Sequence, residues 1–455
     1  MPGHKKSNRP WHVINRYTAT LLIAGGAWCA AIEPATAENL LDAYRLAVDS
    51  DPQLRAAAAN RAAVGEGRRQ SQALYYPNIN LSADASRNRQ ETDTDLGSTT
   101  DNFTNLGYAV NLSQALYRRD YLVQLRQSDA LLREAEAQYR TTEQGLMLRV
   151  AERYFDVLAA QDNLQFAQAE KEALNRQLDQ TQQRFEVGLI AITDVHESQA
   201  AFDTAVASEI AAENQLAVSR EALREVTGEL PSELDILSDD MQLTPPTPAN
   251  VTQWVEEALS SNFEVIAAEA TVDAARQQRA LQRADRYPDI DLVARHGFSD
   301  SGGGFNGDRE TTDTSLGVQL SLPLYQGGGI SSRIRQANDQ LDQAMQGLEQ
   351  QRRATQRLTS DAYLNVLSGI SQVKAFKQAL VSSISALEAT EAGYEVGTRT
   401  TVDVVTNRRN MFRAQRDYAR SRYDYLIATL ALKQAAGLLS PTDLEHINQW
   451  LQPPP

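Results

Sequence analysis

Two short segments of the chain place a carboxylate at the same distance after a glycine. In FEVGLIAITDV, Asp194 lies six residues after Gly188, and in YEVGTRTTVDV, Asp403 lies six residues after Gly397. Glycine is favoured just past a helix end, where left-handed backbone angles let the chain turn back. A carboxylate in the first turn of the next helix can cap that helix or serve a function of its own, and the residues alone leave both alternatives open. The segments therefore predict two helical hairpins that turn at these glycines.

The residue three positions before each carboxylate decides whether a capping box can form there. Thr400 and Asp403 have the spacing of a capping box, in which each side chain bonds the backbone near the other. Ala191 holds the corresponding place before Asp194, and alanine has no side-chain acceptor with which to cap a helix. Capping thus explains Asp403 better than Asp194.

Residue types used in catalysis do not gather into a known pattern. The sequence contains no H-E-x-x-H, G-x-S-x-G or Walker motif. The glycine-rich stretches 301–308 and 325–329 are explained better as a polar loop and as a junction between a strand and a helix. The five histidines are scattered, at His4, His12, His196, His296 and His446. We therefore expect neither an enzyme nor a bound metal or cofactor.

The amino terminus, residues 1–37, has the layout of a secretory signal peptide. Four basic residues precede an apolar run of about 15 residues that leads to the small residues Ala35, Thr36 and Ala37. A transmembrane anchor is the weaker alternative, because a spanning helix needs about 20 apolar residues. The only cysteine, Cys29, lies inside this segment, so we expect the mature chain to have no disulfide bond.

The formal charge of the chain is strongly negative. It is −15 for the whole sequence, and removing the four basic residues and Glu33 of the signal peptide makes it −18. Nucleic acid is therefore not expected as a partner, because phosphate binding requires a positively charged surface.

The chain repeats one plan twice, over 38–230 and 251–440. Equivalent residues lie 209 positions apart, as Tyr154 and Tyr363 do. Each copy is expected to contain a helical stretch of about 35 residues ending at Tyr-Pro, then two strands, a very long helix and a shorter helix. The chain is therefore expected to be an internal duplication.

Two very long helices are expected over 118–186 and 328–396. Neither segment contains proline, and apolar residues recur at steps of three and four, the period of an amphipathic helix. At 1.5 Å per residue each would be roughly 100 Å long, a length that needs coiled-coil-like neighbours. We expect those neighbours to be the shorter returning helices over 192–228 and 401–437.

Two strands per copy are expected, within 77–117 and 288–325. Apolar and polar residues alternate in NINLSADAS and LGVQLSLPL, which is the period of a strand. The stretches 88–105 and 300–314 are rich in Gly, Thr and Asp, and we expect them to be loops between the strands. Alternation alone favours an ordinary half-buried sheet, and four strands are fewer than the about eight that a closed barrel needs. The long helices and the signal peptide favour a barrel shared by several chains.

These features together resemble the TolC family of trimeric outer-membrane channel-tunnels. The resemblance rests on the duplicated plan, on Tyr-Pro before the strands, on LSLPLYQGGG, and above all on VGLIAITDV and EAGYEVGTRTTVDV. It implies a mainly α fold with a small β part. Long antiparallel helices would form an α-barrel, and three chains would each give four strands to a twelve-stranded outer-membrane β-barrel. The connector 231–250 and the tail 441–455 would form an equatorial band.

The same resemblance implies a function. Members of this family are passive exit ducts from the periplasm of Gram-negative bacteria, held in outer-membrane lipid, for drugs or secreted proteins. They act as homotrimers with a periplasmic adaptor (membrane fusion) protein and an energised inner-membrane pump of the RND, ABC or MFS type, and they open at the periplasmic helical tip. The alternative left by the residues is a periplasmic coiled-coil structural or adaptor protein that never enters a membrane.

Matching positions also imply which residues form the gate. Asp403 matches the carboxylate that lines the constriction, and threefold symmetry would turn it into an acidic ring. Thr406 stands where the family often has a second carboxylate, so a second ring is in doubt and weaker cation binding is expected. Phe185 stands in the place of Tyr394, which makes the two tips chemically unequal. The residues implied to latch neighbouring hairpins are Gln177, Thr193, Asp194, Glu391, Tyr394 and Arg399.

Overall fold

The computed structural model describes most of the chain, namely residues 39–95, 97–229, 233–303 and 307–454. Contacts between residues divide the chain into two units, Met1–Thr36 and Ala37–Pro455, and the second unit is described below. The expected signal peptide, 1–37, lies outside the described residues.

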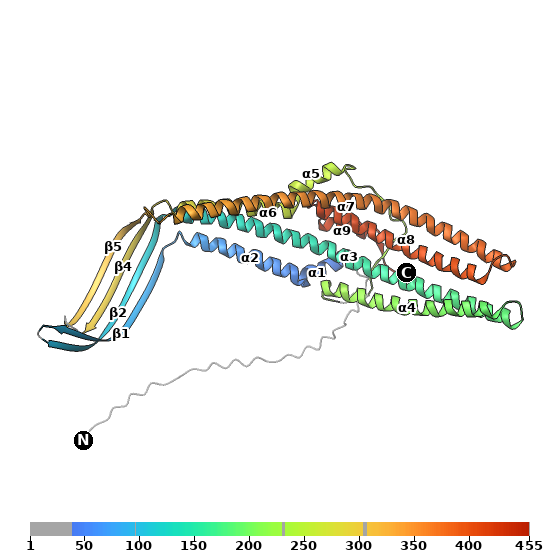
Figure 1. Cartoon of the computed structure of the whole chain (residues 1–455), viewed down its shortest axis with the longest axis horizontal. Helices are drawn as coiled ribbons and strands as arrows, with labels where there is room; N and C mark the ends of the chain where they lie inside the picture. Colours follow the sequence, from blue (N-terminus) through green and yellow to red (C-terminus); the bar gives the residue numbers. More distant parts are fainter. Residues whose placement is uncertain (1–38, 96, 230–232, 304–306, 455) are drawn as a thin grey trace, which may run out of the picture. The chain divides into compact units, whose positions relative to one another are not determined.

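The unit Ala37–Pro455 consists mainly of helices, with one four-stranded sheet (Figure 1). The elements from α1 to α4 and those from α5 to α8 follow the same order, so the duplication seen in the sequence is also seen in the fold. In chain order the elements are α1 (Leu40–Ser50), α2 (Pro52–Ala73), β1 (Asn78–Thr94), β2 (Gly97–Tyr117), α3 (Arg119–Glu186), α4 (Ile192–Thr227), β3 (Ile236–Leu237), α5 (Val251–Ser261), α6 (Phe263–Ala284), β4 (Asp289–Gly302), β5 (Asp308–Ser321), α7 (Gly329–Glu395), α8 (Thr401–Ala435), α9 (Pro441–Asn448) and β6 (Leu451–Gln452).

The first helical stretch of each half, expected to be about 35 residues long, consists of two helices. α1 gives way to α2 at Asp51, and α5 gives way to α6 at Asn262. The Asp51 carboxylate accepts a hydrogen bond from the Leu54 N–H at 2.7 Å, and Asn262 Oδ1 accepts one from the Glu264 N–H at 2.9 Å. Both side chains thus cap a new helix, and Pro52 cannot donate the backbone bond that would continue the old one.

The two long helices, α3 and α7, lie within one residue of the segments expected for them. α3 packs along α4 and α7 packs along α8, which makes two hairpins, and α3 also contacts α8 (Figure 1). The α3–α8 contact joins the two hairpins within one chain. No helix in the described part of the chain is both long enough and apolar enough to cross a membrane.

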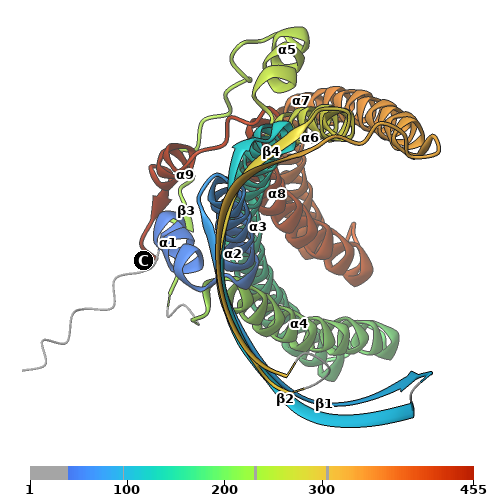
Figure 2. The ribbon, with the colours of Figure 1, turned by 90° about the vertical axis from the view of Figure 1, so that its left-hand side faces the viewer.

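The four long strands form one antiparallel sheet in the order β1-β2-β4-β5, which is strongly curved (Figure 2). The stretches 88–105 and 300–314, expected to be loops, are largely strand. β1 stays paired with β2 up to Thr94, and β4 stays paired with β5 up to Gly302. Alternation is lost there because both faces carry polar side chains, whereas the hydrogen bonds of the ladder involve only the backbone.

One face of the sheet carries apolar side chains that the described part of the unit leaves uncovered. Leu320 pairs with Ile290 and Val318 pairs with Leu292, so these residues share one face. Leu316, Val318 and Leu320 are 75%, 64% and 65% exposed. Within the described residues, the outer edges of β1 and β5 have no partner strand. The sheet therefore has both a free face and free edges.

The main hydrophobic core joins α1, α3, α8 and α9. It contains the fully buried side chains of Tyr154, Phe155, Tyr425 and Leu444. The segment after α4 and the end of the chain meet beside this core, where β3 pairs with β6 and the Tyr154 hydroxyl donates to the Asp235 carbonyl at 2.9 Å. The core fixes α3 against α8 and so sets the positions of the two hairpins.

Candidate gate at the hairpin tips

Both hairpins turn through the same backbone motif. Gly188 and Gly397 have φ angles of 75° and 78°, in the left-handed region that favours glycine. The N–H after each glycine donates to the carbonyl five residues before it, at 2.9 Å in the first hairpin and 2.8 Å in the second. With the bond from the glycine N–H itself, this makes a Schellman motif, which satisfies the last carbonyls of the long helix. Each glycine therefore shapes a turn.

The returning helices begin differently after these turns. In α8 the Asp403 carboxylate accepts from the Thr400 N–H at 3.0 Å, and Thr400 Oγ1 accepts from the Asp403 N–H at 3.3 Å, which completes a capping box. α4 begins after Ala191 with no side-chain cap. The backbone and hydroxyl bonds from Thr400, helped by the charge of Arg399, lower the pKa of Asp403. Asp403 is therefore a cap that carries a charge.

Glu391 joins the two helices of the second hairpin by an ion pair with Arg408. The Arg408 guanidinium is largely buried, and it also donates to the Ala173 carbonyl of α3 at 3.1 Å. One guanidinium thus ties α7, α8 and α3 together close to the tip.

Tyr394 makes two contacts, one inside its hairpin and one to the other hairpin. The Thr401 hydroxyl donates to the Tyr394 hydroxyl at 3.4 Å. The Arg184 guanidinium of α3 lies 4.7 Å from the centre of the Tyr394 ring, which is the distance of a cation–π contact. Tyr394 therefore links the second hairpin to the first.

Three of the predicted latch residues form no side-chain hydrogen bond or ion pair among the described residues, although the charge of one, Arg399, acts on Asp403. They are Thr193 and Asp194 near the start of α4 and Arg399 in the turn before α8. Thr193 and Arg399 are exposed, and Asp194 is half-buried. Their polar groups are available to a molecule outside this chain.

Gln177 of α3 is buried, unlike the other predicted latch residues. It is 5% exposed, and its Nε2 donates to Thr181 Oγ1 on the same helix at 3.4 Å. Thr181 in turn accepts a hydrogen bond from the Ser198 hydroxyl of α4 at 3.2 Å. The structure places Gln177 inside the first hairpin.

Arg408 and Arg184 were absent from the residues predicted by sequence. The partner of Glu391 has a signal in the sequence, because partners across a hairpin lie symmetrically about its turn. Asn407 donates to Thr390 Oγ1 at 3.0 Å, and the bonded pair in the first hairpin, Thr181 and Ser198, lies 209 positions earlier. The position of Arg184 has no such signal, because it depends on how the two hairpins pack.

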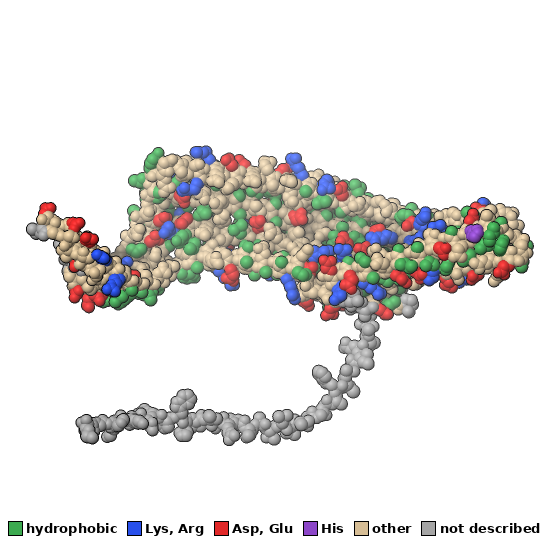
Figure 3. Space-filling model, turned by 60° about the horizontal axis from the view of Figure 1, so that its bottom comes forward, with side chains coloured by type: hydrophobic (Ala, Val, Ile, Leu, Met, Phe, Trp, Pro, Cys, Tyr) green, Lys and Arg blue, Asp and Glu red, His purple; other side chains and the backbone are tan. Residues whose placement is uncertain are grey.

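Apolar side chains gather at the free end of the hairpins, over the turn between α3 and α4 (Figure 3). Val187, Leu189 and Val396 are 70%, 73% and 75% exposed. Soluble surfaces rarely group such side chains unless they contact another molecule. The turns of both hairpins therefore carry exposed apolar side chains.

Comparison with known sequences identifies the family. A family model described as outer membrane efflux protein matches residues 43–229 and 254–438. The chain is 40% identical over 423 residues to outer membrane protein TolC of Vibrio cholerae, which covers 91% of this chain and 94% of that protein. It is 31% identical over 425 residues to the alkaline protease secretion protein AprF of Pseudomonas aeruginosa, which covers 91% and 88%.

Solved structures share the fold. The Campylobacter jejuni CmeC outer membrane channel matches with a TM-score of 0.75 and 15% identity, over 96% of this chain and 97% of that one. CusC matches with a TM-score of 0.76 and 18% identity, over 88% and 92%. The sequence matches are to channels rather than enzymes, and they overturn the alternative of a periplasmic coiled coil outside the membrane. The chain belongs to the outer membrane efflux protein family and is an outer-membrane channel for efflux or secretion whose helices extend into the periplasm.

Proposed function

We propose that three copies of this chain assemble into one duct. The support is the sheet, whose edge strands β1 and β5 have no partner within the described residues. Free edges favour pairing with another chain, and four strands are fewer than the about eight needed for closure. Twelve strands from three chains form the barrel, and the exposed face that contains Leu316, Val318 and Leu320 meets the lipid. The helices of the three chains form the tunnel, with the connector 231–250 and the tail 441–455 as a band around it.

The duct is passive, and an inner-membrane pump supplies the energy for export through it. A periplasmic adaptor protein joins the duct to a pump of the RND, ABC or MFS type, and the exposed Val187, Leu189 and Val396 give that adaptor an apolar surface to contact. The family is named for efflux and one relative for protease secretion, which supports both drugs and secreted proteins as cargo.

The gate of the duct is the ring of hairpin tips. The observation that carries this proposal is that Thr193 and Asp194 on one hairpin, and Arg399 on the other, form no side-chain hydrogen bond or ion pair within the described residues of their own chain. In a ring, the second hairpin of one chain lies beside the first hairpin of the next. Arg399 of one chain then pairs with Thr193 and Asp194 of its neighbour. A charge-assisted contact of this kind contributes about 1–3 kcal/mol.

The remaining latch residues act within each chain. Glu391 and Tyr394 hold the second hairpin against the first through Arg408 and Arg184, and Gln177 supports the first hairpin from inside. Contacts repeated around three chains keep the closed state dominant until an adaptor binds the open state more tightly.

Asp403 from three chains forms the narrowest ring of the tunnel. Its lowered pKa keeps the carboxylate ionised at neutral pH, so the ring carries three negative charges at that pH. Thr406, one turn further along α8, adds no charge to this ring.

The latch is tested by replacing Tyr394→Phe together with Arg399→Ser. The first change removes a hydroxyl and keeps the ring that Arg184 contacts, and the second removes the charge offered to the neighbouring chain. Single-channel conductance in planar lipid bilayers should rise. The control is Arg353→Ser, which breaks only an exposed ion pair with Glu349 on the same helix and should leave conductance unchanged. Equal conductance in the double variant and the control would overturn the latch.

A further inference from the structure

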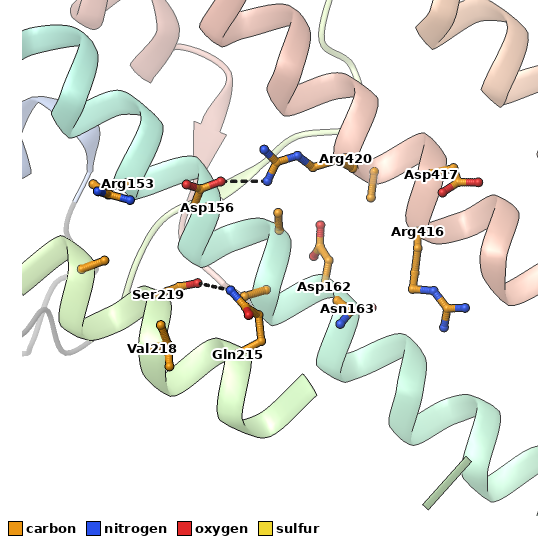
Figure 4. Close-up of a pocket in the computed structure, with 14 residues that line it drawn as sticks. Arg153, Asp156, Asp162, Asn163, Gln215, Val218, Ser219, Arg416, Asp417 and Arg420 are labelled. Atoms are coloured by element: carbon orange, nitrogen blue, oxygen red, sulfur yellow. Dashed lines mark hydrogen bonds and ion pairs between the residues drawn. The ribbon is translucent and has the colours of Figure 1, made fainter. Parts of the chain in front are cut away.

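A cavity of about 480 Å³ lies between α3, α4 and α8 (Figure 4). Its volume is in the range of sites that bind small organic molecules, about 300–1,000 Å³. All of the residues that line it belong to one chain. Part of the wall is apolar, made by Ala159, Ala160, Val218, Ala222 and Ala419.

One part of the cavity wall, made by Asp156 and Asn163, is on the side of α3 that faces away from β3. The Tyr154 hydroxyl bonds the Asp235 carbonyl just before β3, which marks one side of α3. Asp156 and Asn163 follow Tyr154 by two and nine residues, about 200° and 180° around a helix with 3.6 residues per turn. Asp162 follows Tyr154 by eight residues, about 80° around the helix, and so lies nearer to the β3 side. Figure 2 shows α4 and α8 on the concave side of the curved sheet, with β3 and α9 on the other side. In the proposed duct, this concave side faces the tunnel.

Two of the guanidinium groups at the cavity are already neutralised. Arg420 lies 2.8 Å from a carboxylate oxygen of Asp156 and 2.8 Å from one of Asp424. Arg416 pairs with the buried Glu170 at 3.1 Å. These arginines are therefore already paired and do not neutralise the other carboxylates of the cavity.

Two carboxylates of the cavity form no ion pair within the described chain. Asp162 of α3 accepts a hydrogen bond from the Tyr423 hydroxyl at 2.7 Å, and Asp417 of α8 has no side-chain partner there. Arg153 also forms no ion pair within that part of the chain, and it lies at the opposite end of the cavity from Asp417 (Figure 4). The unbalanced negative charge is thus at the end of the cavity where Asp162 and Asp417 lie.

Burial has a larger effect on the pKa of Asp162 than the charged and polar groups around it. It raises the pKa of Asp162 above the ordinary value of 3.8, although the Tyr423 hydrogen bond and the Arg422 charge oppose the change. Asp239 of the segment after β3 adds to the rise. Of the cavity's other charged groups, Arg153 and Asp156 are on α3 and Arg416, Asp417 and Arg420 on α8, while α4 contributes only uncharged residues. Arg422 pairs with Asp239 at 3.1 Å, so half-buried Asp162 has a positive charge nearby but forms no ion pair of its own. A ligand that brings a cation to Asp162 would stabilise its ionised form.

We propose that this cavity binds an organic cation carrying a single ammonium or quaternary nitrogen. The positive charge lies between Asp162 and Asp417, and the hydrocarbon part contacts Ala159, Ala160 and Val218. Arg153 disfavours a second positive charge at the far end. The cavity then gives the duct a site where cationic molecules pause. That role rests on the proposed duct, whereas binding itself needs only one chain.

The probe is ethidium, a fluorescent monocation, added to the purified full chain in detergent. Asp162→Asn keeps an acceptor for the Tyr423 hydroxyl and removes the charge, and it should weaken binding by about tenfold, as expected for losing a charge-assisted contact. Asp417→Asn should weaken it by about threefold, because Asp417 is exposed. The control Asp203→Asn removes an equal charge from an exposed part of α4 and should leave affinity unchanged.

A second variant tests the cavity itself rather than its charge. Ala159→Leu fills the apolar wall, keeps both carboxylates and should also weaken ethidium binding. Binding to the wild-type chain should weaken as the pH falls through the raised pKa of Asp162, because protonation removes the charge. Equal ethidium affinity in Asp162→Asn and Asp203→Asn would overturn the site. Failure of the wild-type chain to conduct in bilayers would overturn the duct and leave the binding result standing.

Discussion

The two hairpin tips turn in the same way but are held together differently. Gly188 and Gly397 adopt nearly equal left-handed angles, and the same backbone bonds close both turns. After the turn, α8 begins with the capping box of Thr400 and Asp403, whereas α4 begins after Ala191 without a cap. The duplicated sequence has kept what the backbone needs in order to turn. Its two copies differ in the side chains that hold the tip together.

The two hairpins also differ in how their polar side chains are bonded near the turn. Polar side chains of the second hairpin are bonded to one another, as in the Glu391–Arg408 pair and the Thr401–Tyr394 hydrogen bond. Asp194 of the first hairpin has no partner among the described residues. The second hairpin therefore has more bonds between its helices near the turn, whereas the first has the Thr181–Ser198 pair there. Arg399 of the second hairpin and Asp194 of the first are both available to another chain.

The largest difference between the hairpins is expected between their two equivalent carboxylates. Asp403→Asn keeps an acceptor for the Thr400 N–H but removes the ring of charge, so block of single-channel conductance by divalent cations should weaken by about tenfold or more. Asp194→Asn should leave this block unchanged. In the wild-type channel the block should be lost on acidification as Asp403 becomes protonated, and the hydrogen bonds from Thr400 shift this loss to lower pH because they lower the pKa of Asp403. Equal block in the two variants would mean that the carboxylates are not distinguished by position.

A smaller difference is expected from the residues that cross each hairpin. Arg408→Ala removes the bonds to Glu391 and to the Ala173 carbonyl, and bonds to charged groups are each worth about 1.5–3 kcal/mol. Its counterpart 209 positions earlier is Gln199, which is bonded only to Asp203 on its own helix. Hydrogen exchange of the tip amides should become about 30-fold faster in Arg408→Ala, the factor that corresponds to about 2 kcal/mol. Gln199→Ala should change the exchange rate little. Similar exchange rates in both variants would contradict the expected difference between the hairpins.

Much of the fold could be predicted because its signals are local and long. α3 and α7 were predicted within one residue, since 68 and 67 residues of uninterrupted helical period leave little choice. The polar ends of the strands were missed because side chains exposed on both faces show no alternation. The break at Asp51 had a signal in the proline that follows it, whereas the break at Asn262 has only its capping side chain.

The candidate site was predictable in its turns and less so in its contacts. A glycine just past a helix end usually has left-handed backbone angles, so the turns at Gly188 and Gly397 could be predicted from the sequence. The contact of Arg184 with Tyr394 joins residues of different hairpins, and no local pattern encodes the angle at which two long helices pack. The burial of Gln177 inside the first hairpin depends on the same packing.

The smallest expected change in stability comes from removing the cap of α8 and adding the equivalent cap to α4. Thr400→Ala removes the cap of α8 and should destabilise its first turn by about 1 kcal/mol. Ala191→Thr places a hydroxyl three residues before Asp194, which can complete a capping box in α4 and should stabilise that turn by a similar amount. Hydrogen exchange at the first-turn amides of both helices measures the two changes. If Ala191→Thr slows exchange in α4, a single side chain accounts for the difference in stability between the two first turns. If it does not, the α4 turn must differ from the α8 turn in a way that a single side chain cannot restore.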